Sequence, residues 1–436
     1  MNRFYKSVLL LTFFFGSLSV RAADTLTVQD VMQRALQNHP AVQRALEDVT
    51  AAEARVGQSR SALYPTVDGV ANYARIGPVP SIPFGSAVFE LAPADNYDLH
   101  ITGRYNLYDF KRTATQVDLS RSRVAVTADA VDAARSTLAY QAARAFYGVV
   151  YFQQALAVQD QQIAALNEHH DIAQKRVQTG VATNLDVLTT DVRVAAAQNQ
   201  RVDLQNMLDK QITVLRELLG LPPQAPVTLR GTLEHTPVTV NEDSLMSVAY
   251  RQRTDLQIAR DAEASARMQQ RVTSLSDLPA LNAFAQYGFK NGYEPHLHEW
   301  VSNWAVGGQL AVPVFSGKRK EFHKQEADAN LRSQQENTRN IQRQIQSDIG
   351  RAVVDVKAAQ SKIDIAAVGI ERARAAIAVA RSAYQYGTIT NVDLLDAETS
   401  LAQANLIQLQ ALYSYELARY NLEQAIGVKV WEPAGQ

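Results

Sequence analysis

Two pairs of histidines are the strongest candidates for a chemical site in this sequence. His169-His170 and His296-x-His298 could each offer two imidazole ligands to a metal ion. Neither pair has the i, i+4 spacing that places two histidines on one face of a helix, and no acidic ligands accompany them in a recognised pattern. Ordinary surface histidines are the favoured interpretation. We therefore predict no metal site and no other cofactor.

Signatures of catalysis are also missing from the sequence. It has no Gly-x-Ser-x-Gly nucleophile elbow, no phosphate-binding loop and no dinucleotide fingerprint. It has no cysteine, which excludes disulfides, thiolate metal sites, a cysteine nucleophile and a lipid anchor on an N-terminal cysteine. The 436 residues carry a formal charge of −1 without a Lys/Arg-rich run, so we expect no nucleic-acid binding. The sequence predicts a protein that is not an enzyme.

Residues 1–22 have the composition of a secretory signal peptide. Arg3 and Lys6 precede an apolar run at 8–15, and a small-residue cleavage site ends at Ala22. The alternative is a membrane anchor, but the run is about half the roughly 20 residues that a helical span needs. No later segment is apolar enough for such a span. We therefore expect the mature protein in the periplasm, outside the cell, or in an outer membrane as β-strands.

Two proline-free stretches, 94–221 and 314–432, predict long helices. Both are rich in Ala, Gln, Leu, Arg and Glu, which favour helix, whereas a proline inside a helix costs about 3 kcal/mol. Each stretch is interrupted by a glycine followed by Thr and Asn, a pattern typical of one helix ending and another beginning. We expect two helical hairpins, with ends near 178–184 and 385–391 and helices near 111–178, 184–219, 318–385 and 391–426.

The apolar positions of the two shorter helices are expected to pack against other helices. They are Leu185, Leu188, Val192 and Ala195 in one helix and Val392, Leu395, Thr399 and Ala402 in the other. Periodicity alone leaves a second interpretation open, in which the helices form a long solvent-exposed coiled-coil rod.

The chain is a tandem duplication. Residues 180–188 recur as 387–395, which are 207 positions later, and the same offset joins 107–112 to 314–319 without a gap. Further upstream the offset is 214, because one loop differs in length between the copies. The predicted organisation is a signal peptide at 1–22, a first structural repeat at 23–220, a linker at 221–243 and a second structural repeat at 244–436.

Short segments of alternating polarity between the helices predict β-strands. Leu99, Ile101 and Tyr105 alternate with polar residues such as His100 and Arg104, and a period of two is typical of a strand. The strands of each repeat are joined by a turn-rich loop. The four expected strands lie near 66–77, 97–108, 280–290 and 300–315.

Strands of about ten residues with one apolar face and aromatic ends are typical of an outer-membrane barrel. Four strands are too few to close one, so several chains must pool their strands, and three chains would supply 12. A soluble four-stranded sheet with one wet face is the alternative. Five aromatic side chains are candidates either for a membrane-interface belt or for ordinary barrel packing: Tyr105, Tyr108, Trp300, Trp304 and Phe315.

These features resemble the TolC-like outer-membrane efflux channels over essentially the whole mature chain. The specific matches are the duplicated strand-to-helix junctions at 109–112 and 316–319 and the two hairpin ends with the pattern Gly-x-x-x-Asn-x-Asp-x-Leu. The resemblance implies a mostly α, α+β fold of duplicated strand-strand-helical-hairpin units. It implies a homotrimer with a 12-stranded β-barrel in outer-membrane lipid and a periplasmic α-helical barrel. It also implies docking on a periplasmic adaptor protein and on an inner-membrane pump, either proton-driven or of the ATP-binding-cassette kind.

The resemblance also assigns residues at the hairpin ends. Tyr384, Asp393 and Asp396 match residues at the narrow end of the tunnel, and Asp186 is the counterpart of Asp393 in the first hairpin. A threefold ring of carboxylates in a narrow pore would favour cations. Helix capping is the alternative role for Asp186 and Asp393, because acidic residues in a first turn suit the helix dipole. The adaptor-docking surface would comprise Thr179, Gly180, Val181, Tyr386, Gly387 and Thr388.

One position departs from the family pattern. Ile389 stands where the resemblance predicts a basic residue that holds the tunnel shut through ionic contacts. Arg176 and Arg381, near the same hairpin ends, are alternative sources of such contacts. The sequence therefore does not identify which residues hold the tunnel shut.

The sequence predicts a passive exit duct of a tripartite efflux pump that exports small molecules. We expect it in the outer membrane of a Gram-negative bacterium, reaching into the periplasm and without a lipid anchor. The outer-membrane duct of a type I protein secretion system is the alternative within transport. A poreless periplasmic structural coiled coil is the alternative outside transport.

Overall fold

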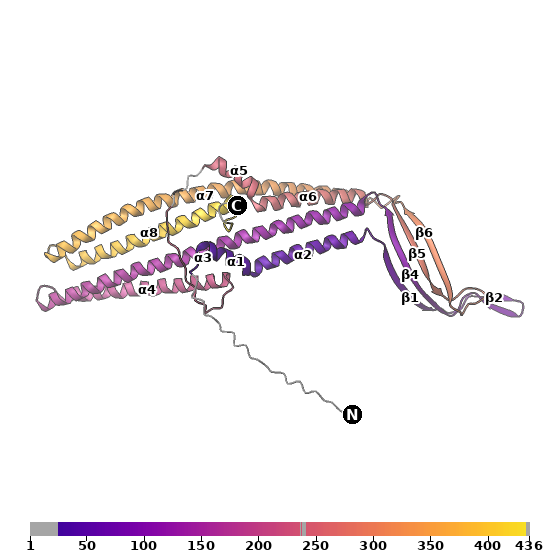
Figure 1. Cartoon of the computed structure of the whole chain (residues 1–436), viewed down its shortest axis with the longest axis horizontal. Coiled ribbons are helices and arrows are strands. Elements are labelled where there is room, and N and C mark those ends of the chain that lie inside the picture. The colour runs from indigo at the N-terminus through magenta and orange to yellow at the C-terminus, as the bar shows by residue number, and fades with distance from the viewer. Residues whose placement is uncertain (1–24, 236, 238–240, 433–436) are drawn as a thin grey trace, which may run out of the picture.

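The computed structural model describes residues 25–235, 237 and 241–432. The expected signal peptide at 1–22 lies outside these residues. Long helices make up most of the molecule, and β-strands form one end of it (Figure 1). None of the described helices combines the length and the hydropathy that crossing a membrane requires.

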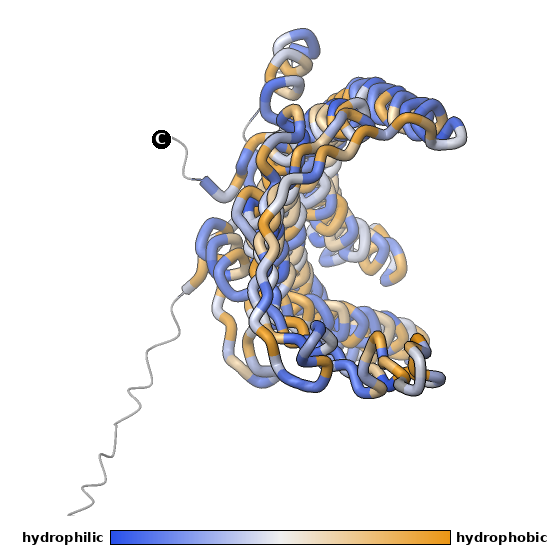
Figure 2. The backbone as a smooth tube through the Cα atoms, turned by 90° about the vertical axis from the view of Figure 1, so that its right-hand side faces the viewer, coloured by the Kyte–Doolittle hydropathy of each residue, from blue (hydrophilic) through white to orange (hydrophobic). Residues whose placement is uncertain are grey.

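Four long helices form two hairpins, and each helix end lies within one residue of its expected position. α3, Arg112–Gln178, and α7, Arg319–Gln385, have 67 residues each, whereas α4, Asn184–Leu218, and α8, Asn391–Ala425, have 35 each. At 1.5 Å per residue, α3 and α7 are about 100 Å long. The helices lie side by side in the order α4-α3-α8-α7. Seen along the long axis, the backbone follows an open curve (Figure 2).

The remaining helices repeat in the same way. α1, Val28–Asn38, and α5, Glu242–Gln252, have 11 residues each, and α2, Pro40–Ser61, and α6, Thr254–Leu275, have 22 each. The first residues of α1 and α5 are 214 positions apart, and those of α3 and α7 are 207 apart. The predicted duplication is therefore confirmed in the lengths and the spacing of the helices.

One antiparallel sheet joins the two repeats. Its strand order is β1-β4-β5-β6, so β1 and β6 are its edges. The contact between β4 and β5 connects residues of the first repeat with residues of the second, for example Ile101 opposite Tyr287. The strands are β1, Thr66–Arg75; β4, Asp95–Tyr108; β5, Ala280–Lys290; and β6, Val301–Ala311.

The expectation of only four strands was wrong. The proline-rich loop between β1 and β4 contains a second, two-stranded sheet made of β2, Ser81–Phe84, and β3, Ala87–Glu90. Figure 1 shows this hairpin beyond the end of the main sheet. Pro83 lies inside β2, and it is tolerated because β2 pairs with β3 on one side only. Part of the loop that was predicted to be turn-rich is thus a β-hairpin.

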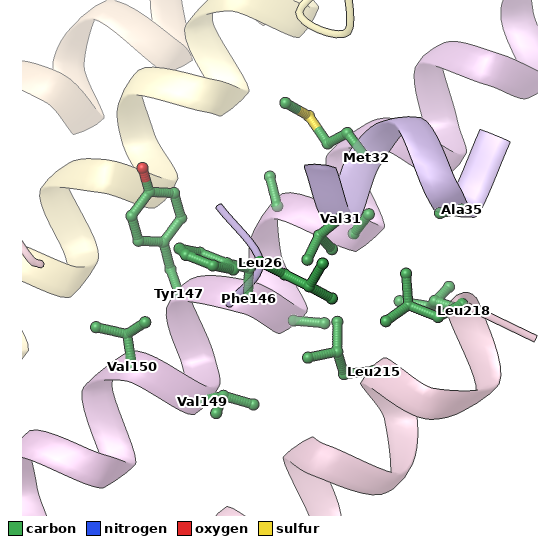
Figure 3. Close-up of a cluster of buried hydrophobic side chains, with 14 of the residues drawn as sticks. Leu26, Val31, Met32, Ala35, Phe146, Tyr147, Val149, Val150, Leu215 and Leu218 are labelled. Carbon is green, nitrogen blue, oxygen red and sulfur yellow. The ribbon is translucent and has the colours of Figure 1, made fainter. Parts of the chain in front are cut away.

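Each repeat has its own apolar core. In the first repeat, Val31 and Met32 of α1 pack with Phe146 of α3 and Leu215 of α4, all essentially inaccessible to solvent (Figure 3). In the second repeat an equivalent cluster contains residues of α5, α6, α7 and α8, with Tyr415 fully buried. Burying one large apolar side chain stabilises a fold by about 1.5–3 kcal/mol. These two cores fix the middle of the long helices.

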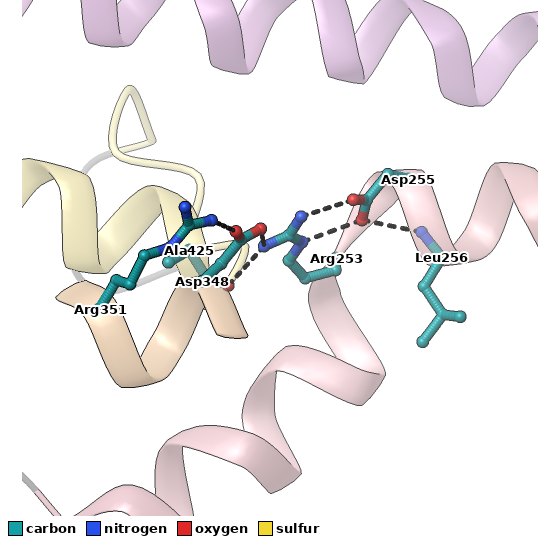
Figure 4. A network of polar contacts seen from close by, with 6 residues as sticks. All are labelled: Arg253, Asp255, Leu256, Asp348, Arg351 and Ala425. Carbon is teal, nitrogen blue, oxygen red and sulfur yellow. Dashed lines mark hydrogen bonds and ion pairs between the residues drawn. The ribbon is translucent and has the colours of Figure 1, made fainter. Parts of the chain in front are cut away.

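A polar network at the start of α6 connects three helices of the second repeat. The Arg253 guanidinium donates to the carboxylates of Asp255 and Asp348 and to the carbonyl of Ala425 (Figure 4). Its Nη1 lies 3.1 Å from Asp348 Oδ2 and 3.1 Å from the Ala425 oxygen. Arg351 donates to the same Asp348 across 2.6 Å. The network ties α6 to the middle of α7 and to the end of α8.

Candidate functional site

One face of the four-stranded sheet is apolar and exposed. Hydrogen-bonded register places Ile101 opposite Tyr287 and Tyr287 opposite Trp304, so apolar side chains of neighbouring strands form a continuous band. Trp304 and Val306 are 75% and 71% exposed, and Val67 of β1 is exposed as well. Water-soluble monomers rarely expose a contiguous apolar surface of this kind. The band therefore needs an apolar environment outside the chain.

The opposite face of the same sheet is polar. Arg104 Nη1 lies 3.4 Å from Asp68 Oδ2, and His100 Nδ1 lies 2.8 Å from Asp98 Oδ1. Alternation between an apolar and a polar face is typical of strands that separate lipid from a water-filled interior. The amides of Asn282, Gln286 and Gln309 continue the polar face on β5 and β6.

Four of the five aromatic residues predicted at the membrane interface lie near the two ends of the sheet, and Trp304 lies farther in, opposite Tyr287. Trp300 and Trp304 lie toward the end that carries the loops, and Tyr105, Tyr108 and Phe315 lie toward the long helices. All five side chains are exposed. A protein that crosses two membrane–water interfaces carries aromatic residues at two such levels. Two of these rings also contact neighbouring rings, Tyr108 with Phe110 and Trp300 with Tyr97, so the interface belt stays a prediction.

The two hairpin ends are tight turns with exposed tips. Gly180 and Gly387 have φ angles of 76° and 71°, a conformation that side chains disfavour. Val181 and Tyr386 beside them are 72% and 82% exposed. The turns therefore hold apolar side chains out into solvent at the end of the molecule. The hydroxyls of the two other predicted tip residues, Thr179 and Thr388, donate back to carbonyls of their own helices.

Two of the four predicted constriction residues cap helices. The backbone N–H of Thr183 donates to Asp186 Oδ2 across 2.9 Å at the start of α4, and Thr390 makes the same 2.9 Å contact with Asp393 at the start of α8. Hydrogen bonds from the hydroxyl and the N–H of Thr390 hold the pKa of Asp393 below its ordinary value. The capping role left open by the sequence is thus present at both positions.

Asp396 pairs across the two hairpins. Arg193 Nη2 of α4 donates to Asp396 Oδ1 of α8 across 2.7 Å. Both side chains remain substantially exposed, and exposed pairs contribute only about 0–1 kcal/mol. The Asp396 carboxylate is therefore accessible to water and ions at this level of the helices.

Tyr384, the fourth predicted constriction residue, is buried between the hairpins. The Arg176 guanidinium of α3 lies 4.3 Å from the centroid of the Tyr384 ring. Arg176 Nη2 also donates to the carbonyls of Tyr384 and Gln385, across 3.0 Å and 3.2 Å. Ile389, which stands at the expected basic position, packs with Tyr384 in an apolar cluster. Arg176 therefore supplies a cationic contact between the hairpins.

Arg381 acts within the second hairpin. Its Nη2 lies 3.7 Å from Glu398 Oε1, which joins α7 to α8. Burial raises the pKa of Glu398, and the second carboxylate oxygen is buried without a hydrogen-bond partner. Arg381 is thus positioned to hold one hairpin together, and Arg176 to join the two.

The prediction that the His169-His170 pair lies on the surface was wrong for His169. This side chain is 3% exposed, and its Nε2 lies 2.5 Å from Asn391 Oδ1 of α8. His169 shares one face of α3 with the buried residues Leu166 and Ala173. That i, i+3, i+7 spacing is the sequence signal that indicates a buried histidine.

The second histidine pair is exposed as expected. His296 and His298 lie in the loop between β5 and β6, where their nearest acidic partners are Glu299 and Glu90. Within the part of the chain that the structure describes, no group of three or more His, Cys, Asp or Glu side chains could hold a metal ion.

The outermost long helices carry apolar residues that stay largely exposed within one copy of the chain. Leu185, Leu188 and Val192 of α4 are 61–67% exposed, and Ile365 and Val379 of α7 are exposed similarly. The α4 residues line a groove of about 430 Å³ together with Val392 and Leu395 of α8. Within one copy of the chain these α4 side chains are therefore covered only in part, next to Val392 and Leu395 of α8.

The sequence matches the family model of the outer membrane efflux proteins over residues 31–221 and 245–428. It is 23% identical to outer membrane protein TolC of Escherichia coli over 425 residues, which cover 94% of this chain and 84% of that protein. It is also 23% identical to the alkaline protease secretion protein AprF of Pseudomonas aeruginosa over 436 residues, with 96% and 89% covered.

Solved structures agree with these relationships. The crystal structure of the outer membrane protein VceC of Vibrio cholerae matches with a TM-score of 0.76 and 20% identity, covering 92% of this chain and 96% of that one. The predicted fold, the resemblance to TolC-like channels and the location in the outer membrane are confirmed. The chain belongs to the outer membrane efflux protein family.

Proposed function

We propose that three copies of this chain form a passive exit duct for small molecules across the outer membrane. The observation that carries the proposal is the four-stranded sheet with one apolar face, one polar face and two edge strands. Unpaired strand edges are costly in lipid, because each unsatisfied backbone group there costs several kcal/mol. Pairing β6 of one copy with β1 of the next removes the edges, and three copies supply 12 strands around a polar interior.

The helices support the same assembly. Their order leaves α4 at one end of the curve and α7 at the other. In the proposed trimer, α4 of one copy packs against α7 of the next, which covers the apolar faces of both helices. The 12 long helices then enclose a tunnel that continues from the barrel. A closed ring of this kind leaves neither outer helix unpaired.

The hairpin ends are the proposed periplasmic mouth. Val181 and Tyr386 would form the docking surface for a periplasmic adaptor protein, together with their neighbours at the two turns. An inner-membrane pump would supply the energy. The duct itself needs no substrate pocket, because selectivity then resides in the pump.

We place the tunnel constriction at Asp396, with Tyr384, Asp393 and Asp186 around it. Replacing both Asp393 and Asp396 by Asn is expected to weaken block of the channel by multivalent cations about tenfold or more. A tenfold loss of cation affinity corresponds to only 1.4 kcal/mol. The three copies together lose six carboxylates, which is enough to cause it. Single-channel recording with a trivalent cation on the periplasmic side measures the effect.

Asp191→Asn is the matched control for this variant. Asp191 is an exposed acid farther along α4 that pairs with His170. Its replacement should leave cation block unchanged. Equal block in the wild type and in the double variant would refute the proposed carboxylate ring.

Deleting the gene in its own host tests the function itself. Efflux predicts that a fluorescent dye accumulates several-fold inside the cells and that the gene on a plasmid restores its export. The name of AprF describes protease secretion, so protein secretion is the second candidate. Loss of one secreted polypeptide from the medium without dye accumulation would favour that candidate. If neither dye nor secreted protein changed, the duct function would be wrong.

A further inference from the structure

A buried polar contact joins the two hairpins near their ends. His169 of α3 is 3% exposed and Asn391, the first residue of α8, is 5% exposed. Their side chains meet across 2.5 Å, between residues that are 222 positions apart in the sequence. Because one partner belongs to each hairpin, the contact must break if the hairpins separate.

The hydrogen bonds of the Asn391 amide nitrogen show which atom of the amide faces His169. Its Nδ2 donates to the carbonyl oxygen of Asp186 across 3.0 Å and to the hydroxyls of Thr189 and Thr190 across 3.2 Å and 3.4 Å. A carbonyl oxygen accepts only, so the nitrogen of the amide must face this side and the oxygen must face His169. His169 Nε2 therefore carries a proton and donates it. The contact joins α3, α4 and α8 at one point.

The charged and titratable groups around His169 come from three further positions. Arg176 follows on α3, Asp186 lies on α4, and the Tyr384 ring of α7 lies 5.1 Å from the imidazole. Burial is the largest influence on the pKa of His169 and lowers it below 6.5, and Arg176 lowers it further. The hydrogen bond with Asn391 and the charge of Asp186 act in the opposite direction without reversing the result.

We propose that the His169–Asn391 contact is an acid-sensitive latch, which holds the two hairpins together while His169 is neutral and releases them when His169 takes up a second proton. The proposal rests on the proposed function, in which the hairpin ends close the periplasmic mouth. An imidazolium still donates to Asn391, so the hydrogen bond survives protonation. Protonation costs free energy because it buries a cation beside the Arg176 guanidinium. Separation of the hairpins relieves this cost by letting water reach the imidazole ring.

The sign of the pH effect follows from linkage. A lowered pKa in the closed state means that the closed state binds fewer protons than the open one. The latch therefore stabilises the closed state fully above about pH 6.5, and this contribution is lost as pH falls from there toward the lowered pKa. Glu398, farther along α8, has a raised pKa and acts in the opposite sense. Variants of His169 separate the two contributions.

Single-channel recording tests the latch. Lowering the pH on the periplasmic side from about 7.5 to about 5.5 should raise the open probability of the wild type several-fold, because the open state binds more protons than the closed state over this range. His169→Gln, which keeps an uncharged donor, should abolish the response. His170→Gln is the control. The His170 imidazole pairs with Asp191 inside the first hairpin, so the pH response of the channel should remain.

A second measurement uses the unmodified protein. Hydrogen–deuterium exchange at the imidazole C2 carbon, followed by mass spectrometry, reports the pKa of each histidine in the closed channel. His169 should titrate clearly below 6.5, whereas titration at or above 6.5 would overturn the latch, even if His169→Gln failed to fold. A pH response that survives in His169→Gln would overturn it as well. Absence of any conductance at every pH would instead count against the duct itself.

Discussion

Replacing Val306 by lysine is expected to abolish insertion of the protein into the outer membrane. Val306 lies on the apolar face of β6, opposite Ala285 of β5, and is 71% exposed. A lysine on the lipid face near the bilayer midplane costs about 2–4 kcal/mol, and a trimer carries three of them. The total rivals the entire stability of many folded domains. Heat-modifiable mobility and detergent-dependent extraction from membranes measure the loss.

Lysine at Ala305 is the matched control. Ala305 precedes Val306 on the same strand, lies opposite Gln286 and belongs to the polar face. The same side chain would there enter a water-filled interior, so membrane insertion should be retained. Equal insertion of both variants would contradict the assignment of the apolar face to lipid.

Glutamate at both Leu188 and Val192 is expected to abolish the trimer. These side chains of α4 are 61% and 67% exposed within one copy of the chain, and in the proposed assembly they pack against α7 of the next copy. Burying an unpaired charge costs several kcal/mol, and each closed ring contains three identical interfaces. Native mass spectrometry in detergent should show monomers in place of trimers.

Gln198→Glu adds the same charge to another face of the same helix. At 100° per residue, Gln198 lies about 120° around α4 from Val192, and it is exposed. The trimer should survive this substitution. A stable trimer of the Leu188→Glu, Val192→Glu variant would show that α4 does not form the contact between copies.

The long helices could be predicted from the sequence because their signals are local. Prolines are absent from them, and a glycine with a following Thr and Asn marks each hairpin end. The two offsets, 207 and 214, were sufficient to predict the duplication from the sequence alone, and the helices repeat with the same spacing. The β2–β3 hairpin was missed for the converse reason: Pro83 opposes a strand locally, and only pairing on one side permits it there.

The contacts between the hairpins could not be predicted in the same way. His169 meets Asn391 and Arg176 meets the Tyr384 carbonyl across more than 200 positions of sequence. Periodicity identifies which face of a helix is buried, but not which residue of another helix lies opposite it. Asp186 and Asp393 illustrate a further limit, because capping and lining a pore require the same residue type at the same position.

The most direct test of the proposed duct is the conductance of the purified mature protein in a planar bilayer, with the oligomeric mass determined in the same detergent. Three copies per particle with a small, cation-selective conductance at neutral pH are predicted, since the hairpin ends close the tunnel. A protein that osmotic shock releases in soluble form, and that conducts no ions, would contradict the duct and favour a structural coiled coil.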